Sequence, residues 1–208
     1  MIDHVLQQLR DDMPKLGMQP IRSSALINAV IAEIGESGTM DVTVSQIAKR
    51  AGMSTALAHH YFGSKNKMFV AAMRHILTQY STEMRNNLNG VKDPFERIEV
   101  IIQTSFSDLN MKRETVAAWL NFYVFAQKSD EVARLLKIYH KRLESNLRFE
   151  LRQIAPEKAE SVAEGIAAII DGGYIRWVLR GCDDVPQHPE NLAIDYLRLT
   201  LADSRILR

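Results

Sequence analysis

The sequence predicts an all-α protein of about nine helices, with a small N-terminal three-helix head followed by a larger helical bundle. Two observations predict this class. Apolar residues recur at helical spacing along nearly the whole chain, and the strict alternation that is typical of strands is almost absent. Capping residues, Gly and Pro stand between the periodic segments, where helices are expected to start and stop.

Local signals predict the helix boundaries. The first helix is expected to begin at Pro20 and to end before Gly38, because Pro suits a first turn and Gly suits the position after a last turn. Ser64 is an N-cap, and the long helix that it starts runs to about Leu88. Further helices are expected over residues 93–109, 113–127, 130–153, 156–180 and 189–201.

The strongest motif is a pair of short helices between residues 43 and 62, which read TVSQIAKRAGMSTALAHHYF. Thr43 and Gln46 form a capping box for the first helix. Gly52 permits a tight turn, and Ser54 is the N-cap of the second helix. The outer face of the second helix is polar or small, as a DNA groove requires, with Thr55, Ala56, His59 and His60. The motif is therefore interpreted as a helix-turn-helix, with an ordinary helical hairpin as the alternative.

The distribution of charge favours nucleic-acid binding by the same segment, although the net charge is only +1. Residues 42–82 contain no Asp or Glu. They carry the cationic residues Lys49, Arg50, Lys65, Lys67 and Arg74, together with three His. An acid-free basic segment in a nearly neutral chain suggests a polyanion site. Chance clustering on a solvated face would give the same pattern.

Composition excludes several other classes of protein. The chain has 208 residues, of which 46% are hydrophobic and 25% charged, as in an ordinary globular protein. A lone Cys182 excludes an intramolecular disulfide framework. No apolar run reaches the ~18 residues of a membrane span, and the N-terminus does not resemble a signal peptide, so we expect a cytoplasmic protein. No phosphate loop, zinc-spaced His pair or nucleophile elbow is present, so we expect no enzyme, no cofactor and no metal.

Two segments resemble the signature of the TetR family of bacterial repressors: Ala51-Gly52-Met53-Ser54 and His60-Tyr61-Phe62-Gly63-Ser64-Lys65. The resemblance implies an N-terminal arm at residues 1–19, a DNA-binding domain at 20–65 and a ligand-binding and dimerisation domain at 66–208. The implied DNA-binding residues are Thr43, Ser54, Thr55, Ala56, His59, His60, Tyr61 and Lys65. Among these, Thr43, Tyr61 and Lys65 are expected to contact the DNA backbone. His59 stands where the family commonly has Tyr, so the contact at that position departs from the family pattern.

Residues 13–22, MPKLGMQPIR, resemble the beginning of the BetI subgroup of this family, and residues 118–122 and 168–172 fit it as well. Members of that subgroup repress the genes that convert choline to glycine betaine, with choline as inducer. The resemblance implies the same function here. It also implies that residues 1–12 are an extension or that translation starts at Met13. Ser23 departs from the subgroup, which has an arginine in the arm.

Aromatic residues and one carboxylate on two predicted body helices form the candidate ligand site. The residues are Trp119, Phe122, Tyr123, Asp171, Tyr174 and Trp177. A quaternary ammonium ion donates no strong hydrogen bond, so aromatic faces with a carboxylate nearby are best suited to hold it. The alternative is that the aromatic side chains fill the core and that Asp171 pairs with Arg176 or Arg180.

The two expected helices over 156–180 and 189–201 are apolar on more than one side, which predicts burial against the body and against a second copy of the chain. The sequence therefore predicts a homodimer that binds a near-palindromic DNA operator and answers to a small-molecule inducer. Two alternatives remain. One is a repressor of the same family with another ligand, such as an efflux regulator. The other is an all-helical enzyme or ligand-binding protein whose site lies among the aromatic residues.

Overall fold

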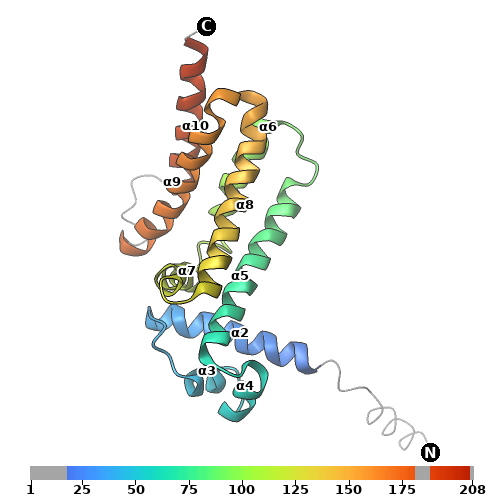
Figure 1. Cartoon of the computed structure of the whole chain (residues 1–208), viewed down its shortest axis with the longest axis vertical. Helices are drawn as coiled ribbons and strands as arrows, with labels where there is room; N and C mark the ends of the chain where they lie inside the picture. The colour runs from blue at the N-terminus through green and yellow to red at the C-terminus, as the bar shows by residue number, and fades with distance from the viewer. Residues whose placement is uncertain (1–17, 181–187, 207–208) are drawn as a thin grey trace, which may run out of the picture.

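The computed structural model describes residues 18–180 and 188–206. Nine α-helices, α2 to α10, and one 3₁₀ turn account for the regular structure within these ranges, which confirms the predicted all-α class. Figure 1 shows a small head at the N-terminal end and an elongated helical body that extends from it. Most of the expected N-terminal arm, up to residue 17, lies outside the described residues.

The head consists of α2 (Met18–Ser37), α3 (Val44–Arg50) and α4 (Thr55–Phe62). Each of the three helices contributes a fully buried side chain, namely Ile34, Ile47 and Ala58. α3 packs against both α2 and α4. The head therefore has a small apolar core of its own, as the spacing of its apolar residues predicted.

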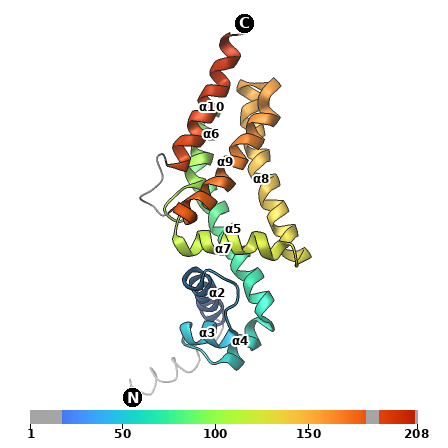
Figure 2. The ribbon, with the colours of Figure 1, turned by 90° about the vertical axis from the view of Figure 1, so that its left-hand side faces the viewer.

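The body is built from six helices and a short 3₁₀ turn. They are α5 (Lys65–Leu88), α6 (Pro94–Ser105), α7 (Arg113–Ala126), α8 (Asp130–Ile154), η2 (Pro156–Lys158), α9 (Ala159–Arg180) and α10 (Pro189–Ile206). α5 leaves the head directly after α4 and runs up the body beside α8 (Figure 1). α7 crosses the end of the body that faces the head (Figure 2). Among the described residues, no helix is long and apolar enough to cross a membrane.

Helix ends agree with the predictions in the head, apart from the start of α2, and differ in parts of the body. α2 begins at Met18, two residues before the predicted Pro20, since the first turn of a helix tolerates Pro20. α6 ends at Ser105 and not near residue 109, because the Asn110 side chain donates to the carbonyl of Thr104 at 2.8 Å and so satisfies the end of the helix. The segment after Pro156 begins as the 3₁₀ turn η2, and α10 continues beyond residue 201.

The head and the body approach each other closely at Gly35, where α2 packs against α7. A β-carbon at this position would lie 2.3 Å from the β-carbon of Glu114 and 2.5 Å from its α-carbon. Asn121, also on α7, donates from Nδ2 to the carbonyl of Gly38 at 3.2 Å. α7 is therefore in direct contact with both α2 and the turn that follows it.

We expect Gly35→Ala to destabilise the protein, although Ala is the better helix former by about 1 kcal/mol. The added methyl group meets backbone atoms of α7 that cannot rotate away, and forced repacking of this kind costs about 1–3 kcal/mol. Thermal unfolding measures the effect. Ser24→Ala, at an exposed position of the same helix, is the control and should not lower the melting temperature. A Gly35→Ala protein that melts at or above the wild-type temperature would contradict this account of the junction.

Candidate DNA-binding surface and ligand site

A tight turn joins α3 to α4 and gives the head the geometry of a helix-turn-helix. Gly52 has a φ of 66°, which residues with a side chain rarely adopt. The amide of Met53 donates to the carbonyl of Ala48 at 2.9 Å and closes the turn. Ala48 and Ala58 are fully buried, so small side chains allow the two helices to pack closely. The predicted motif is therefore present.

Side-chain caps fix the start of both helices in the motif. The Gln46 amide donates to Oγ1 of Thr43 at 3.2 Å, and the Thr43 amide donates to Oε1 of Gln46 at 2.7 Å. The Leu57 amide donates to Oγ of Ser54 at 3.2 Å. Both capping residues are exposed, and Ser54 stands directly before the outer surface of α4.

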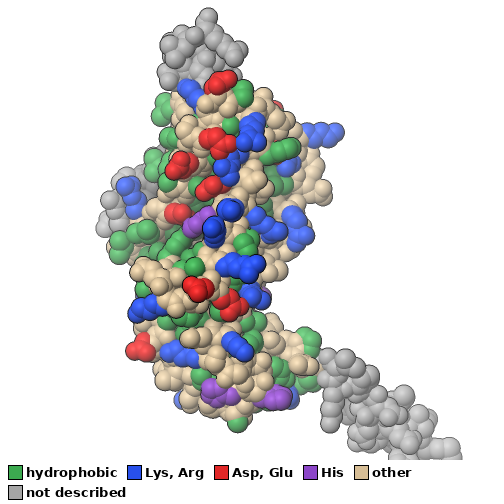
Figure 3. All heavy atoms as spheres, viewed as in Figure 1, with side chains coloured by type: hydrophobic (Ala, Val, Ile, Leu, Met, Phe, Trp, Pro, Cys, Tyr) green, Lys and Arg blue, Asp and Glu red, His purple; other side chains and the backbone are tan. Residues whose placement is uncertain are grey.

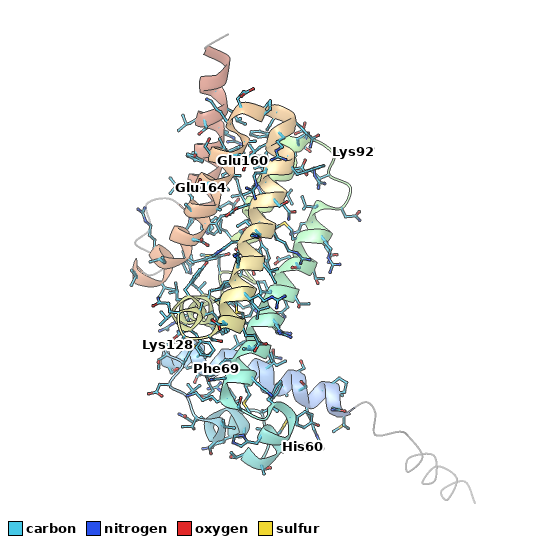
Figure 4. The ribbon with its side chains drawn as sticks, in the orientation of Figure 1. His60, Phe69, Lys92, Lys128, Glu160 and Glu164 are labelled. Atoms are coloured by element: carbon cyan, nitrogen blue, oxygen red, sulfur yellow. The ribbon has the colours of Figure 1, made fainter. Side chains whose placement is uncertain are left out.

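The outer surface of α4 is exposed and holds no bulky apolar side chain. It carries Thr55, Ala56, His59 and His60. Figure 4 labels His60 on α4, at the end of the molecule opposite the C-terminus, and Figure 3 shows histidine at that tip. Nδ1 of His59 lies 3.3 Å from the carbonyl oxygen of Gly63. Tyr61 is half-buried, with its ring 6.0 Å from that of His60. This shape and polarity suit the major groove of DNA.

The acid-free segment is partly neutralised by carboxylates from other helices. Arg50 forms ion pairs with Glu33, at 2.6 Å, and with Glu36, both of α2. Arg74 pairs with Glu131 of α8 at 2.8 Å. Two of the five Lys and Arg residues in the segment are therefore paired with carboxylates from outside it. The sequence of residues 42–82 alone did not reveal these pairs.

The remaining positive charge of this segment lies on three lysines. Lys49 and Lys67 are exposed, and neither forms an ion pair with a residue that the structure describes. Lys65 is the first residue of α5, and its amine lies 5.5 Å from the centre of the Phe69 ring. The helix N-terminus and this amine together suit a phosphate group. The predicted backbone contact of Lys65 stays a prediction.

In the body, the structure brings together three of the six predicted ligand residues. The rings of Trp119 and Tyr123, both on α7, lie 6.2 Å apart. The Tyr123 hydroxyl donates to Oδ1 of Asp171 on α9 at 2.9 Å. Two residues of α8 that were not predicted complete the group: the Tyr139 ring lies 4.8 Å from Trp119, and the His140 ring stacks on Tyr123 at 5.9 Å. We call these five residues the aromatic–acid cluster.

The other three predicted ligand residues form no ring contact or hydrogen bond with this cluster. The Tyr174 hydroxyl donates to the carbonyl of Ser105 at 2.5 Å, in a fully buried site against α6. The Trp177 ring packs edge-on against His188 at 5.7 Å. Phe122 is fully buried in the core. Asp171 is not paired with Arg176, and the side chain of Arg180 lies outside the described residues.

Charge in the aromatic–acid cluster depends mainly on Asp171. Burial raises the pKa of this carboxyl group, whereas the hydrogen bond from Tyr123 and the nearby His140 oppose the rise. Nε2 of His140 lies 3.7 Å from Oδ2 of Asp171. Burial raises the pKa of Tyr123 and Tyr139 far above the usual phenol value, and the Asp171 carboxylate adds to the effect. The tyrosines therefore stay neutral, and the negative charge of the cluster comes from Asp171.

A helix-turn-helix head with an exposed second helix, built onto a helical body, defines a DNA-binding transcriptional regulator. Comparison with known proteins gives the family. Residues 26–72 match the bacterial regulatory proteins of the tetR family, and residues 94–202 match the C-terminal domain of BetI-type transcriptional repressors. The chain belongs to the TetR family, and its C-terminal part is of the BetI type.

Relatives named HTH-type transcriptional regulator BetI match almost the whole chain. The HTH-type transcriptional regulator BetI of Brucella suis is 48% identical over 193 residues, which cover 91% of this chain and 96% of that protein. The protein of the same name from Rhizobium meliloti is 45% identical over 190 residues, 91% of this chain and 94% of its own length. Such relatives are transcriptional regulators and not enzymes, so the chain is a DNA-binding repressor.

Solved structures of more distant proteins share the fold. A transcriptional regulator from Rhodococcus superposes with a TM-score of 0.77 at 22% identity, covering 87% of this chain and 96% of that one. A putative transcriptional regulator from Saccharomonospora viridis, solved in complex with choline, superposes with a TM-score of 0.73 at 18% identity, covering 85% and 95%.

Lys65→Ala is expected to weaken binding to every duplex, because the predicted partner of the amine is a phosphate. The slope of log affinity against log salt should fall by about 0.9, the value for one phosphate contact. Fluorescence anisotropy over a salt series measures both quantities. Lys92→Ala removes an exposed lysine beyond the far end of α5 (Figure 4) and should leave the slope unchanged. An equal change in both variants would remove Lys65 from the interface.

Proposed function

We propose that the chain represses genes for the synthesis of glycine betaine and that choline, bound in the body, releases it from DNA. Membership of the TetR family and the BetI-type C-terminal domain support this function. The Saccharomonospora viridis regulator, which has the same fold and was solved in complex with choline, adds support for this ligand. The proposed partners are a near-palindromic operator, choline and a second copy of the chain, and the proposed location is the cytoplasm, at the nucleoid.

We also propose the division of labour that the sequence suggested, with an arm at residues 1–19, DNA binding by 20–65, and ligand binding and dimerisation by 66–208. The helix-turn-helix geometry of the head supports the second unit. The aromatic–acid cluster and the exposed apolar residues of the last two helices support the third.

The observation that carries the ligand proposal is the position of the Asp171 carboxylate among the rings of the aromatic–acid cluster. Choline keeps its positive charge at every pH, so its site has to compensate for the loss of water by other means. Aromatic faces do so, with each well-placed ring contributing on the order of 0.5–2 kcal/mol. A partly buried carboxylate adds the opposite charge. Rings from α7 and α8 and a carboxylate from α9 supply both features.

A route from this site to the DNA-binding surface runs through α7. Trp119 and Tyr123 of this helix belong to the cluster, while Glu114 and Asn121 of the same helix contact the head. A ligand that shifts α7 therefore also shifts α2. Choline can release DNA only if it prefers the conformation whose heads are wrongly spaced for the operator, and coupling of about 1–3 kcal/mol is typical of such systems.

Exposed apolar side chains on α9 and α10 support a homodimer. They are Ile175, Val178, Leu179, Leu192 and Leu199, of which Leu179 is 78% exposed and Leu199 71%. Large apolar groups gathered on two neighbouring helices are characteristic of a protein interface. We propose that these helices pair with their copies, so that two heads reach major grooves about 34–36 Å apart or a multiple of that distance.

Asp171→Asn is expected to weaken choline binding by about tenfold or more, because it removes the negative charge and keeps an acceptor for Tyr123. Titration calorimetry with choline measures the change. Asp108→Asn is the matched control, since Asp108 is an exposed carboxylate near His188, the neighbour of Trp177. A loss of choline affinity in Asp108→Asn but not in Asp171→Asn would indicate that choline binds near Trp177 instead. Betaine aldehyde, glycine betaine and unrelated cations tested alongside would reveal a repressor with another ligand, such as an efflux regulator.

Bound operator should weaken choline binding by the same factor by which choline weakens operator binding. The operator is first obtained by selection from random duplexes. Equal choline affinity with and without the operator would contradict the inducer role.

Leu179→Glu is expected to convert a dimer into a monomer and to weaken operator binding by about tenfold or more, since a single head reads only half of a two-fold site. Light scattering gives the mass, and anisotropy gives the affinity. Val124→Glu, at an apolar position of α7 that is 61% exposed, is the control and should remain dimeric. A wild-type protein that is monomeric at the concentration where it binds operator would overturn the proposed assembly.

A further inference from the structure

One side chain on the outer surface of α4 has its hydrogen-bonding character fixed by the protein itself. His59 is exposed, and its Nδ1 lies 3.3 Å from the carbonyl oxygen of Gly63. Thr55 and Ala56 stand four and three residues before it on the same helix, so the three residues share one side of α4. The ring of His59 is therefore held in one orientation on the surface that is proposed to face the DNA groove.

The end of α4 supplies the acceptor for this ring. Gly63 follows the last residue of α4 and has a φ of 74°, a conformation that glycine adopts at helix ends. Its amide donates to the carbonyl of His59 at 2.7 Å, while its own carbonyl faces the imidazole of the same residue. The orientation of the ring consequently follows from the way the helix ends.

The partner of Nδ1 determines which ring nitrogen carries the proton. A carbonyl oxygen has no hydrogen to give, so Nδ1 of His59 has to be the donor. A neutral imidazole has only one N–H group, which leaves Nε2 as an acceptor with a free lone pair. Within the described part of the chain, the His59 ring forms no second hydrogen bond and no ion pair, so Nε2 is available to a ligand.

The neighbouring histidine has no such constraint. The His60 ring lies edge-on to that of Tyr61 and forms no hydrogen bond with any residue that the structure describes. Either of its nitrogens can therefore carry the proton, and it can present a donor or an acceptor. His60 is thus a natural comparison for His59.

An acceptor in the major groove distinguishes two classes of base. Adenine presents its N6 amino group there and cytosine its N4 amino group, and both groups donate. Guanine presents N7 and O6 and thymine presents O4, all of which accept. A lone pair on Nε2 would gain a hydrogen bond from an amino base and would face another lone pair at a keto base.

We propose that Nε2 of His59 accepts a hydrogen bond from the amino group of one base, and that His59 thereby selects adenine or cytosine against guanine and thymine at that position. This inference rests on the proposed contact of α4 with the major groove. It goes further by assigning the chemical group that His59 recognises.

Nitrogen-15 NMR of the free protein tests the tautomer without any DNA. At about pH 8, where an ordinary histidine is mostly neutral, the His59 ring should carry its proton on Nδ1. His60 in the same spectrum is the internal control, and its proton should not be confined to Nδ1. A His59 ring with its proton on Nε2 would overturn the proposal.

Selection from random duplexes at the same pH tests the recognition. The wild-type protein should prefer adenine or cytosine at one position where His59→Ala has no preference. His60→Ala is the matched control and should keep the preference at that position. A preference for guanine or thymine that His59→Ala erases would overturn the acceptor role and keep α4 in the groove.

Replacing the selected base then isolates the amino group. If the base is adenine, 2-aminopurine still pairs with thymine but carries its amino group in the minor groove. If it is cytosine, 2-pyrimidinone lacks the amino group. Wild type and His60→Ala should each lose about tenfold in affinity, the effect of one lost hydrogen bond in the groove. His59→Ala should lose less than about twofold.

Two outcomes separate this inference from the proposed function. Equal losses in all three proteins would overturn the role of His59 while operator binding stands. A wild-type protein that selects no duplex would overturn the proposed operator binding and this inference with it.

Discussion

The crossing of α2 and α7 is the contact on which the relation between head and body depends. At residue 35 there is no space for even a methyl group, because the backbone of Glu114 occupies it. Contacts this close do not deform gradually, since packed helices resist compression. The head is therefore held to the body at two places, by the packing of α2 on α7 and by the packing of α2 on α5. Figure 2 shows α7 crossing between the head and the rest of the body. The same helix carries Trp119 and Tyr123 of the aromatic–acid cluster.

Helix starts in the head could be predicted because each depends on a few residues of its own helix. Thr43, Ser54 and Ser64 all cap the helices that they were expected to begin. The end of α6 could not, because the side chain of Asn110 satisfies it from beyond the helix. The neutralisation of Arg50 could not be predicted either. Its ion pair with Glu33 of α2 depends on how two helices pack and not on the local sequence.

The candidate ligand site was only partly predictable. The face that Trp119 and Tyr123 share follows from helical spacing. Asp171 could be singled out because it is an isolated carboxylate in an apolar run. Tyr139 and His140 carried no signal of their own, because an aromatic residue on the apolar face of α8 looks like ordinary core. Trp177 stands six residues after Asp171 and so points about 120° away from it, which separates the two around α9.

The hydrogen bond between Tyr123 and Asp171 has a consequence for ligand selectivity. One carboxylate oxygen already accepts from the phenol, and the other lies close to His140. The phenol occupies one of the roughly four acceptor positions of the carboxylate, and the aromatic faces around it accept only weakly. A primary ammonium ion entering the proposed site would lose water from three N–H donors and would depend largely on this one carboxylate to replace it, which is costly in a buried place. A fully methylated nitrogen has no N–H donors to satisfy, so the proposed site would favour it over a primary ammonium ion.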